Sequence, residues 1–371
     1  MESIVLRRYE PGDENGIIEL RNEIFDSTKH SDLLTWQWEY VNTSQGMSKI
    51  FLYEDHGKIV GHNAIIPILL KYKDKIVLSG KSEGAMMHKR YRGYGNRFIN
   101  LVKKTLESSH KEGLNVIWGF PNKAAIKPHT MSGFNSIGNV CALIKIINFR
   151  PVLERSILSY IKSRFIAYIL VNLAFPVLYL LNLFINLRRL NFSKNISVKI
   201  ISKFDDRIDN LWEKASKDYG ITIVRSSKYL NWRFVENPYI ANKIFIAERG
   251  EEILGYIILS TYKTMQNFKV GFISDLFFIK SEKAALKCLL NRAIRYFEKE
   301  AIEIISLLIV KGSYDNKSFL NIFRKRGFIF KNRNLFRPHP FIVNVNENKV
   351  NSEFLNDIKN WYITYAFREG I

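Results

Sequence analysis

A glycine-rich segment of the chain has the residue types and the spacing of a phosphate-binding loop. It reads GAMMHKRYRGYGNRF, and it joins an apolar run that predicts a strand to an amphipathic run that predicts a helix from Asn96. Gly93 and Gly95 at this turn allow the backbone to approach a ligand, and the free N–H groups of the helix N-terminus attract phosphate. Arg90 and Arg92 add charge-assisted contacts. The segment lacks Gly-Lys-Ser/Thr and GxGxxG, so it is neither a P-loop nor a dinucleotide-binding fingerprint.

The elements that must position this loop follow from polarity patterns. Alternating apolar residues predict strands, and an apolar face at helical spacing predicts the helices between them. The expected strands are 3–8, 49–54, 59–73, 76–88 and 115–120, and the expected helices are 14–25, 96–110 and 122–131. Strands and helices built around one sheet indicate an α/β or α+β fold.

Four landmarks of the sequence occur twice. They pair Trp36-Gln37-Trp38 with Trp232-Arg233-Phe234, Gly61 with Gly255, Ser82-Glu83 with Ser274-Asp275, and Gly133-Phe134 with Gly327-Phe328. The separations are 196, 194, 192 and 194 residues, and a nearly constant separation predicts two copies of one domain. We expect the copies at 1–148 and 196–345, an apolar helical bridge at 149–195 and a C-terminal helix at 346–371.

The segment from Arg90 to Gly95 resembles the signature Gln/Arg-x-x-Gly-x-Gly/Ala that follows the fourth strand in the GNAT superfamily of N-acetyltransferases. The run NVIWGFPN resembles the fifth strand of that family, and Gly133-Phe134 resembles the pair that closes its next helix. The resemblance covers the whole first copy and, more weakly, the second. It implies two tandem GNAT-like domains, each a mixed, mostly antiparallel sheet flanked by helices, with acetyl-CoA or another acyl-CoA as the cofactor.

In this family the N–H groups of the loop hold the pyrophosphate of coenzyme A, and the parting of strands four and five admits the pantetheine arm. The resemblance implies a set of cofactor-binding residues around the loop and the fifth strand, namely Met86, Met87, Arg90, Arg92, Gly93, Tyr94, Gly95, Asn96 and Asn122. Asn122 is also suited to capping the helix that follows it.

The second copy departs from this pattern. At a separation of 192 residues, Arg90 of the loop aligns with Glu282. Gly93 and Gly95 align with Ala285 and Lys287. An acidic residue then stands where phosphate would bind, and no glycine remains. We therefore expect the second copy to bind no coenzyme A.

Acyl transfer to an amine needs a base for the amine and a proton for the leaving thiolate. The resemblance implies Glu83, seven residues before Arg90 on the fourth strand, as the general base. It implies His129 as the proton donor, because the family places a tyrosine four residues before the closing Gly-Phe pair. The same count in the second copy gives Phe323, which cannot donate a proton. A structural salt bridge for Glu83 and a surface or capping position for His129 stay open.

The bridge between the copies contains 23 residues without a charge, from Phe165 to Leu187. Lys162 and Arg164 precede this run, and two further arginines follow it. Its length meets the criterion of about 20 apolar residues for a membrane span. Three placements stay open: a helix buried between the domains, a helix in the plane of a membrane interface, and a span. A span conflicts with the packing of the two copies as a pseudo-dimer.

Composition restricts the remaining classes. The chain of 371 residues has a formal net charge of +21, which indicates anionic partners such as an anionic membrane surface. No nucleic-acid recognition motif accompanies this charge, so we do not expect a nucleic-acid partner. Two cysteines exclude a disulfide framework, and the seven histidines show no metal-ligand spacing, so no metal is expected. The N-terminus shows no signal peptide, so we expect a cytoplasmic protein, peripheral on the inner face of the cytoplasmic membrane.

These observations predict a coenzyme A-dependent N-acyltransferase, most simply an acetyltransferase. The expected acceptor is a small-molecule or lipid-linked amine, on a sugar or a cell-envelope precursor. Three alternatives stay open. One is an aminoacyltransferase of the peptidoglycan-bridge type that uses charged tRNA, and another takes its acyl group from an acyl carrier protein. The third is not an enzyme but an acyl-CoA sensor or scaffold.

Overall fold

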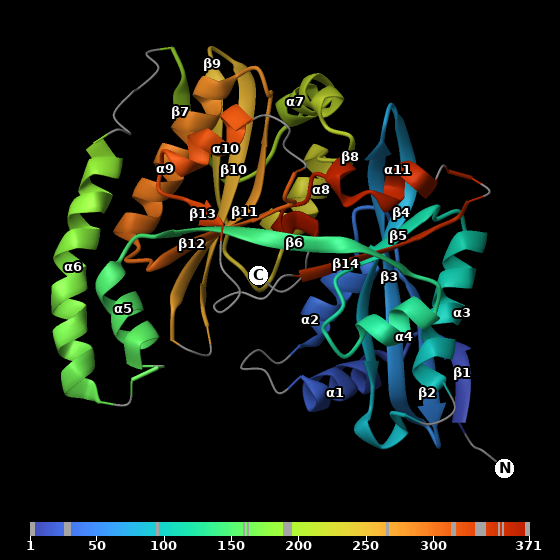
Figure 1. Ribbon diagram of the computed structural model, residues 1–371. Helices are drawn as coiled ribbons and strands as arrows, with labels where there is room; N and C mark the ends of the chain where they lie inside the picture. Colours follow the sequence, from blue (N-terminus) through green and yellow to red (C-terminus); the bar gives the residue numbers. More distant parts are fainter. Residues whose placement is uncertain are drawn as a thin grey trace. The chain divides into compact units, whose positions relative to one another are not determined.

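Two sheets, each covered by helices, are assembled from interleaved segments of the chain (Figure 1). The computed structural model describes residues 4–25, 31–93, 96–158, 160–161, 163–187, 195–264, 267–312, 317–330, 339–347, 349–350 and 352–367. Unit 1 comprises Met1–Val140, Tyr219–Ala241 and His339–Tyr362, and unit 2 comprises Cys141–Asp218, Asn242–Pro338 and Ile363–Ile371. Each unit therefore takes segments from both halves of the sequence.

The sheet of unit 1 places β1 to β5 in chain order, followed by β14 and the first half of β6. These strands are β1 (Ile4–Arg8), β2 (Lys49–Asp55), β3 (Lys58–Tyr72), β4 (Lys75–Met87), β5 (Val116–Gly119), β6 (Asn135–Ile146) and β14 (His339–Val345), and β8 (Ile221–Ile223) pairs with the end of β3. Neighbouring strands are antiparallel except β4 and β5, which are parallel. Strand β3 is buried on both faces, because its nearly continuous apolar run lies between helices.

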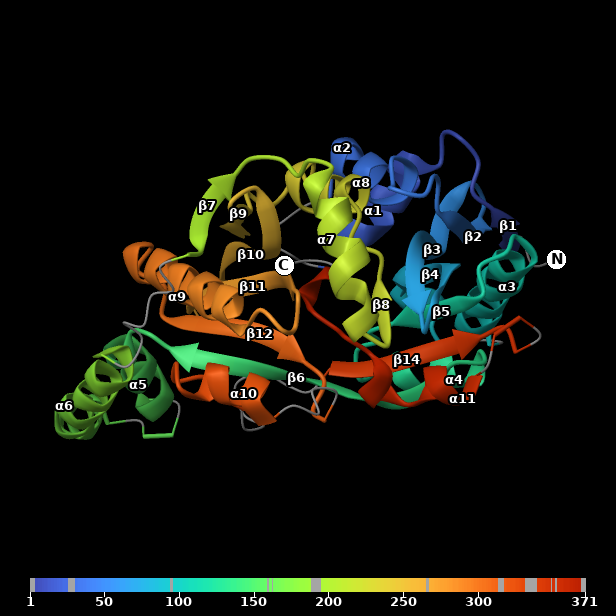
Figure 2. The same ribbon diagram turned by 90° about the horizontal axis from the view of Figure 1, so that it is seen from above.

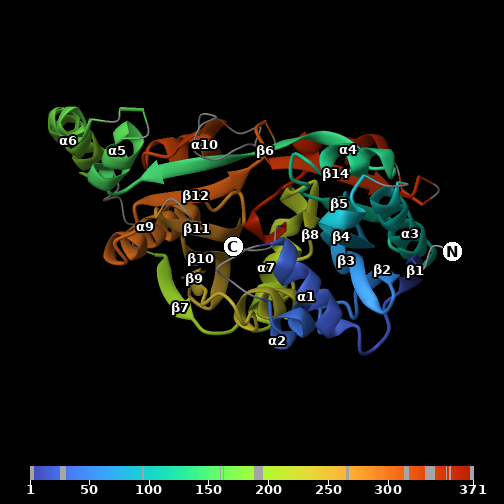
Figure 3. The same cartoon turned by 90° about the horizontal axis from the view of Figure 1, so that it is seen from below.

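Helices cover both faces of this sheet, as Figure 2 and Figure 3 show. One face carries α1 (Glu14–Ile24) and α2 (Leu33–Trp36), and the other carries α3 (Arg97–Lys111) and α4 (Ile126–Met131). Leu101, Val102 and Leu106 form the buried face of α3. Val102 and Leu106 pack with Ile65 of β3 and Ile117 of β5, as the helical spacing of the apolar residues requires. Unit 1 also contains α8 (Ser227–Leu230) and α11 (Ser352–Asn356).

The sheet of unit 2 has the strand order β7-β9-β10-β11-β12 and ends with the second half of β6. Its strands are β7 (Ser197–Ile201), β9 (Lys243–Arg249), β10 (Glu252–Lys263), β11 (Lys269–Phe278) and β12 (Ile304–Ile309), and β13 (Ile329–Phe330) pairs with β6. Only β11 and β12 are parallel neighbours among these pairs. The helices of unit 2 are α5 (Phe149–Leu158), α6 (Arg164–Leu187), α7 (Arg207–Ala215), α9 (Lys283–Lys299) and α10 (Lys317–Arg324).

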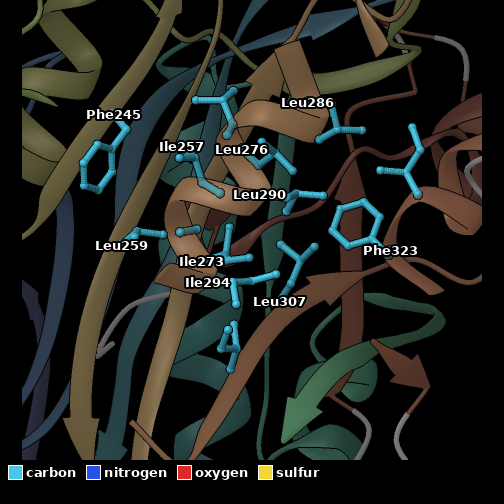
Figure 4. Close-up of a cluster of buried hydrophobic side chains, with 14 of the residues drawn as sticks. Phe245, Ile257, Leu259, Ile273, Leu276, Leu286, Leu290, Ile294, Leu307 and Phe323 are labelled. Atoms are coloured by element: carbon cyan, nitrogen blue, oxygen red, sulfur yellow. The ribbon is translucent and has the colours of Figure 1, made fainter. Parts of the chain in front are cut away.

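The core of unit 2 lies between its sheet and α9. The buried side chains of α9 repeat at helical spacing, from Ala285 and Leu286 to Phe297. They meet apolar residues of β10, β11 and β12, and Phe323 of α10 joins the same cluster (Figure 4). On the opposite face, Trp212 of α7 stacks on the ring of Phe277.

The order of elements is similar in the two halves of the sequence. Both halves contain a π-helical turn, at Gln37–Val41 and at Asn231–Val235, which lie 194 residues apart. The equivalent tryptophans are therefore Trp38 and Trp232, and the alignment of Trp36 with Trp232 is wrong by two residues. Trp38 and Trp232 stack in unit 1, and each indole N–H donates to the backbone oxygen of the other, at 2.8 and 3.1 Å.

The compact units do not follow the expected boundaries 1–148 and 196–345. Strand β14, from the second half of the sequence, lies between β5 and β6 in unit 1, and residues 141–146 of β6 pair with β12 in unit 2. The two halves thus exchange strands. The expected C-terminal helix at 346–371 is also absent from the described residues, which contain only short helical turns, at Ser352–Asn356, Ile358–Asn360 and Tyr365–Phe367.

The apolar bridge forms helix α6, which packs against α5. Within the described chain it is the one helix long and apolar enough to cross a membrane by length and composition, from Arg164 to Phe184, and 11% of its apolar 18-residue window is buried. The structure therefore does not show this segment as a buried helix between domains.

Candidate active site

The pairing between β4 and β5 ends partway along β4. Residues 79–81 pair with residues 116–118 of β5, and β4 then continues to Met87. Residues 82–87 thus have an edge at which β5 contributes no ladder partner, although the backbone oxygens of Gly84 and Met87 accept hydrogen bonds from the side chains of His62 and Arg92. Glu83, Met86 and Met87 lie in this stretch, as the sequence predicts, and both methionine side chains are buried.

A β-bulge follows Glu83 directly. Asn63 of β3 faces the stretch between Glu83 and Met86, where β4 has one residue more than β3. Gly84 in this bulge has φ of +60°, and a Cβ atom there would lie 2.6 Å from the hydroxyl oxygen of Tyr40. Only glycine fits this position without displacing the tyrosine.

Glu83 is paired with a buried lysine two residues earlier on the same face of β4. Lys81 Nζ lies 2.7 Å from Glu83 Oε2, and the side chains are 7% and 24% exposed. Burial alone would raise the pKa of Glu83, but the ammonium group of Lys81 holds it below its usual value. Burial lowers the pKa of Lys81 in turn. At neutral pH the carboxylate is therefore ionised and partly accessible.

Further polar side chains are buried around this pair. Arg21 of α1 bonds the Glu39 carboxylate at 2.8 Å, and Glu39 is nearly inaccessible. His62 of β3 donates from Nδ1 to the backbone oxygen of Gly84 at 2.8 Å, and its ring meets Tyr40 edge-on. Burial lowers the pKa of His62 to about 4, so the imidazole is neutral and its Nε2 is a hydrogen-bond acceptor.

Four buried polar atoms in this region have no hydrogen-bond partner among the described residues. They are Glu39 Oε1, His62 Nε2 and both amide atoms of Asn63. Strand alternation puts His62 on the Glu83 face of the sheet and Asn63 on the opposite face. Buried polar atoms in folded proteins are normally bonded to protein or water, so these atoms are candidates for contacts with a ligand or ordered water.

The described part of the loop after β4 contains two residues with positive φ. Gly93 has φ of +82°, and no atom lies within 4 Å of the position of a Cβ there. Asn96 adopts a left-handed conformation immediately before α3. Arg90 is exposed, whereas Arg92 donates from Nε to the backbone oxygen of Met87 at 2.8 Å. Tyr94 and Gly95 lie outside the described residues.

His129 is a packed side chain of α4. Its ring lies between those of Phe98 and Phe134, with centroids 5.5 Å from each, and the residue is 4% exposed. Nδ1 donates to the backbone oxygen of Ala125 at 2.7 Å, and burial lowers the pKa of the imidazole. The side chain is thus neutral with its proton held on Nδ1, which does not favour a proton donor. The sequence-based role of His129 stays a prediction.

Asn122 is exposed and accepts a hydrogen bond from the backbone N–H of Ala125 on its Oδ1 atom, at 3.0 Å. This contact stabilises the turn before α4, which is the capping role that the sequence leaves open. It leaves the amide nitrogen of Asn122 available to a ligand.

The connection between β11 and α9 in unit 2 differs from the loop between β4 and α3 in unit 1. Strand β11 ends at Phe278 and α9 begins at Lys283, so four residues connect them, against nine between β4 and α3. Ala285 and Lys287 lie inside α9, so their alignment with the loop glycines is wrong. Glu282 is held by two hydrogen bonds from Arg249, at 2.9 and 2.7 Å.

The acid of the second copy is fully bonded. Asp275 is inaccessible and accepts hydrogen bonds from the hydroxyl groups of Tyr256 and Thr364, each at 2.7 Å. Both carboxylate oxygens of Asp275 thus accept a hydrogen bond from within the protein. Among the described residues, no three His, Cys, Asp or Glu side chains are grouped to hold a metal ion.

Comparison with known protein families gives one match, in the N-terminal part of the chain. Residues 5–129 match the family described as an acetyltransferase (GNAT) domain. No curated protein sequence matches the chain. Because the match covers the β1–α4 region, it includes the bulge, Glu83 and the loop described above.

Solved structures resemble the chain over both units. A GCN5-related N-acetyltransferase from Anabaena variabilis has a TM-score of 0.62 at 10% identity, over 92% of this chain and 72% of that chain. A conserved protein of unknown function from Enterococcus faecalis, called a probable N-acyltransferase, has a TM-score of 0.62 at 9% identity, over 93% and 73%. The N-myristoyltransferase of Saccharomyces cerevisiae with bound myristoyl-CoA has a TM-score of 0.55 at 10% identity, over 93% and 79%. At these identities the likeness shows the fold.

Proposed function

We propose that residues 5–129, which match the acetyltransferase (GNAT) domain family, transfer an acyl group from coenzyme A to an amine with Glu83 as the general base. The observation that carries the proposal is the position of the Lys81–Glu83 pair. It lies where β4 loses β5 as a neighbour and directly before the bulge at Gly84. An ionised, partly exposed carboxylate there can accept a proton from the ammonium group of the substrate, which frees the amine lone pair to attack the thioester carbonyl, and the coenzyme A thiolate leaves as the amide bond forms.

The residues around the loop fit the phosphate groups of coenzyme A. The open space at Gly93 allows close backbone approach, and the N-terminus of the 15-residue helix α3 offers free N–H groups and a favourable dipole. Arg90 is exposed and can reach an anion. When bound, acyl-CoA supplies the activated thioester carbonyl. The yeast structure with bound myristoyl-CoA supports an acyl-CoA as the ligand of this fold.

Lys81 keeps Glu83 ready to act as the base. Without the lysine, burial would favour the protonated carboxyl group, which could not accept a proton. The neighbouring ammonium group preserves the anion near neutral pH. The contact with Lys81 also makes Glu83 a weaker base, because it lowers the pKa of the carboxyl group. We therefore expect Glu83 to take a proton only from an amine that approaches it directly.

We further propose an amino sugar or another cell-envelope precursor, free or lipid-linked, as the acceptor. On the Glu83 side of the sheet, Glu39 Oε1 and His62 Nε2 are both acceptors without a partner among the described residues. Acceptor atoms suit a substrate rich in hydroxyl or amino donors, as amino sugars are. The exposed apolar helix α6 supports a lipid-linked form and a location on the inner face of the cytoplasmic membrane.

Calorimetry and a panel of donors and amines test this function. We expect wild-type protein and Glu83→Gln to bind acetyl-CoA equally well, and Glu83→Gln to lower kcat about 10²- to 10⁴-fold. Glu252→Gln is the control, because Glu252 forms an exposed ion pair with Lys214 and should leave kcat unchanged.

Three results would contradict the proposal. Full kcat in Glu83→Gln excludes that residue as the base. Turnover with charged tRNA or acylated carrier protein, but not with acyl-CoA, assigns a different donor. Binding of acyl-CoA without turnover on any amine favours a sensor or scaffold.

A further inference from the structure

Helix α6 exposes apolar side chains around most of its circumference. At 3.6 residues per turn, its exposed large apolar residues occupy an arc of about 220°, from the side of Tyr168 to that of Leu181. The remaining side faces α5 and includes the buried residues Ala167 and Val171. Figure 1, Figure 2 and Figure 3 agree that α6 lies beside α5 at the margin of unit 2.

The width of this arc favours lipid over a protein groove. A helix that docks into a groove buries a stripe of roughly 100° and keeps its opposite face polar. The outer side of α6 has no such polar face: Leu173, Tyr179 and Phe184 are each more than half exposed. A bilayer surface can cover a wide apolar arc, because acyl chains adapt to its shape.

The charged residues that flank α6 in the sequence indicate a bilayer that contains anionic lipids. Residues 149–195 contain seven Lys or Arg side chains and one Glu. The uncharged run lies in the middle of this segment, so the basic residues stand on either side of it in the sequence. Two of them, Arg150 and Arg155 of α5, are paired with Glu154 and Glu303. Basic residues that flank an apolar helix attract the phosphate groups of anionic lipids.

The connections of α6 argue against a span. The chain enters the α5–α6 pair from β6 and leaves it to β7, and both strands belong to the sheet of unit 2. A crossing helix would put β6 and β7 on opposite sides of the bilayer, unless the chain returned through the hydrocarbon with unbonded backbone groups. A helix that lies in the plane of the membrane interface keeps β6 and β7 on the same side of the bilayer, and it needs no return of the chain through the hydrocarbon.

We infer that α6 is an interfacial anchor, which lies in the plane of an anionic bilayer with its outer arc among the lipid chains and α5 on the water side. The anchor attaches unit 2 to the membrane surface. It depends on neither Glu83 nor acyl-CoA, so it stands or fails independently of the proposed reaction.

Vesicle flotation of the full chain tests the anchor without detergent. The probes are vesicles of phosphatidylcholine alone and vesicles of phosphatidylcholine mixed with phosphatidylglycerol. We expect the protein to float with the mixed vesicles and to remain below the neutral ones. Leu173→Asp and Leu180→Asp should each lower the partition coefficient at least about tenfold, because a buried leucine contributes more than a factor of ten. Leu34→Asp is the matched control, since Leu34 is 63% exposed and Leu173 is 68% exposed.

Other outcomes overturn the inference. If the wild-type chain stays below both kinds of vesicle, α6 is no anchor. If it sediments as a dimer that Leu173→Asp dissociates, a second copy covers the arc. If protease added outside sealed vesicles digests only one side of α6, the helix spans the bilayer. An equal loss of flotation in Leu34→Asp would show that the effect is not specific to α6. Circular dichroism of each variant verifies that it is folded.

Discussion

Replacing Lys81 with methionine tests whether the buried ion pair keeps Glu83 ionised. Methionine retains most of the volume of the lysine and removes its charge. The Lys81–Glu83 contact of 2.7 Å involves side chains that are 7% and 24% exposed, so Lys81→Met leaves a mostly buried carboxylate without its nearest cation. Removal of one partner from a buried pair typically costs about 3–5 kcal/mol, because the other charge stays desolvated.

An exposed pair of the same length provides the comparison. Lys214 and Glu252 lie 2.6 Å apart with side chains 57% and 44% exposed. Such pairs contribute about 0–1 kcal/mol, because water screens them. Urea unfolding at neutral pH should therefore show a loss of about 3–5 kcal/mol for Lys81→Met and below about 1 kcal/mol for Lys214→Met, with similar m-values.

The pH dependence separates this mechanism from a simple packing defect. In the wild type the pKa of Glu83 is lowered, so the pair stabilises the fold above the pKa of an unfolded glutamate, and this contribution is lost as the pH falls through the lower folded value. Without Lys81, burial raises the pKa of Glu83. The stability gap between wild type and Lys81→Met should then shrink at acid pH, and the acidic limb of kcat/KM should move to higher pH.

Two results would refute this reasoning. One is a loss of stability in Lys81→Met no larger than in Lys214→Met. The other is an acidic limb of kcat/KM that stays in place or moves to lower pH. Either would mean that Lys81 does not set the charge of Glu83.

Two further predictions concern the bulge and α4. Gly84→Ala and Gly57→Ala both place alanine at a positive φ, at a cost of about 1 kcal/mol, but only Gly84→Ala adds a contact with the Tyr40 hydroxyl. Gly84→Ala should thus lose about 1–3 kcal/mol more in urea unfolding, and equal losses would disprove the close fit. His129→Phe should keep kcat within a few-fold and lose about 1 kcal/mol with the hydrogen bond to Ala125. A large fall in kcat at unchanged KM would restore His129 as a proton donor.

Local structure was largely predictable, because periodicity encodes it. The strands expected at 49–54, 59–73 and 76–88 are Lys49–Asp55, Lys58–Tyr72 and Lys75–Met87, and the helix expected at 96–110 is Arg97–Lys111. Each of these segments ends where its pattern of apolar and polar residues gives way to turn residues. The turn around Gly57, for example, has positive φ and fixes the hairpin between β2 and β3.

The exchange of strands was not predictable in the same way. A short strand with alternating polarity fits the edge of any sheet, so periodicity does not choose its neighbour. Contacts distant in sequence make that choice for β14. Asn344 donates to the backbone oxygen of Gly133 at 2.6 Å, and the side chain of His110 bonds Asn344, which lies 234 residues further along the chain. A single sequence does not reveal such pairs.

The surroundings of Glu83 were only partly predictable. The spacing Lys81-x-Glu83 on a strand puts both side chains on one face, which was a usable signal for the ion pair. His62 and Asn63 interrupt an otherwise apolar strand, and two polar residues in such a run mark a site as well. The role of Glu39 was not foreseeable, because it depends on the packing of the π-helical turn against the sheet.

Glu83 and Asp275, which stand at matching positions in the two halves of the sequence, have different surroundings. In unit 2 Asp275 is satisfied by two hydroxyl groups, and the loop before α9 is shortened to a turn. In unit 1 His62 Nε2 and the Asn63 amide are buried without partners in the described chain, although each unpaired group costs about 1–3 kcal/mol. Apolar replacements at His62 and Asn63 would remove that cost. On the Glu83 face of the sheet, such a cost at His62 is understandable where its Nε2 atom binds substrate, and we therefore propose that catalysis takes place in unit 1, which has the loop and the partly exposed Glu83.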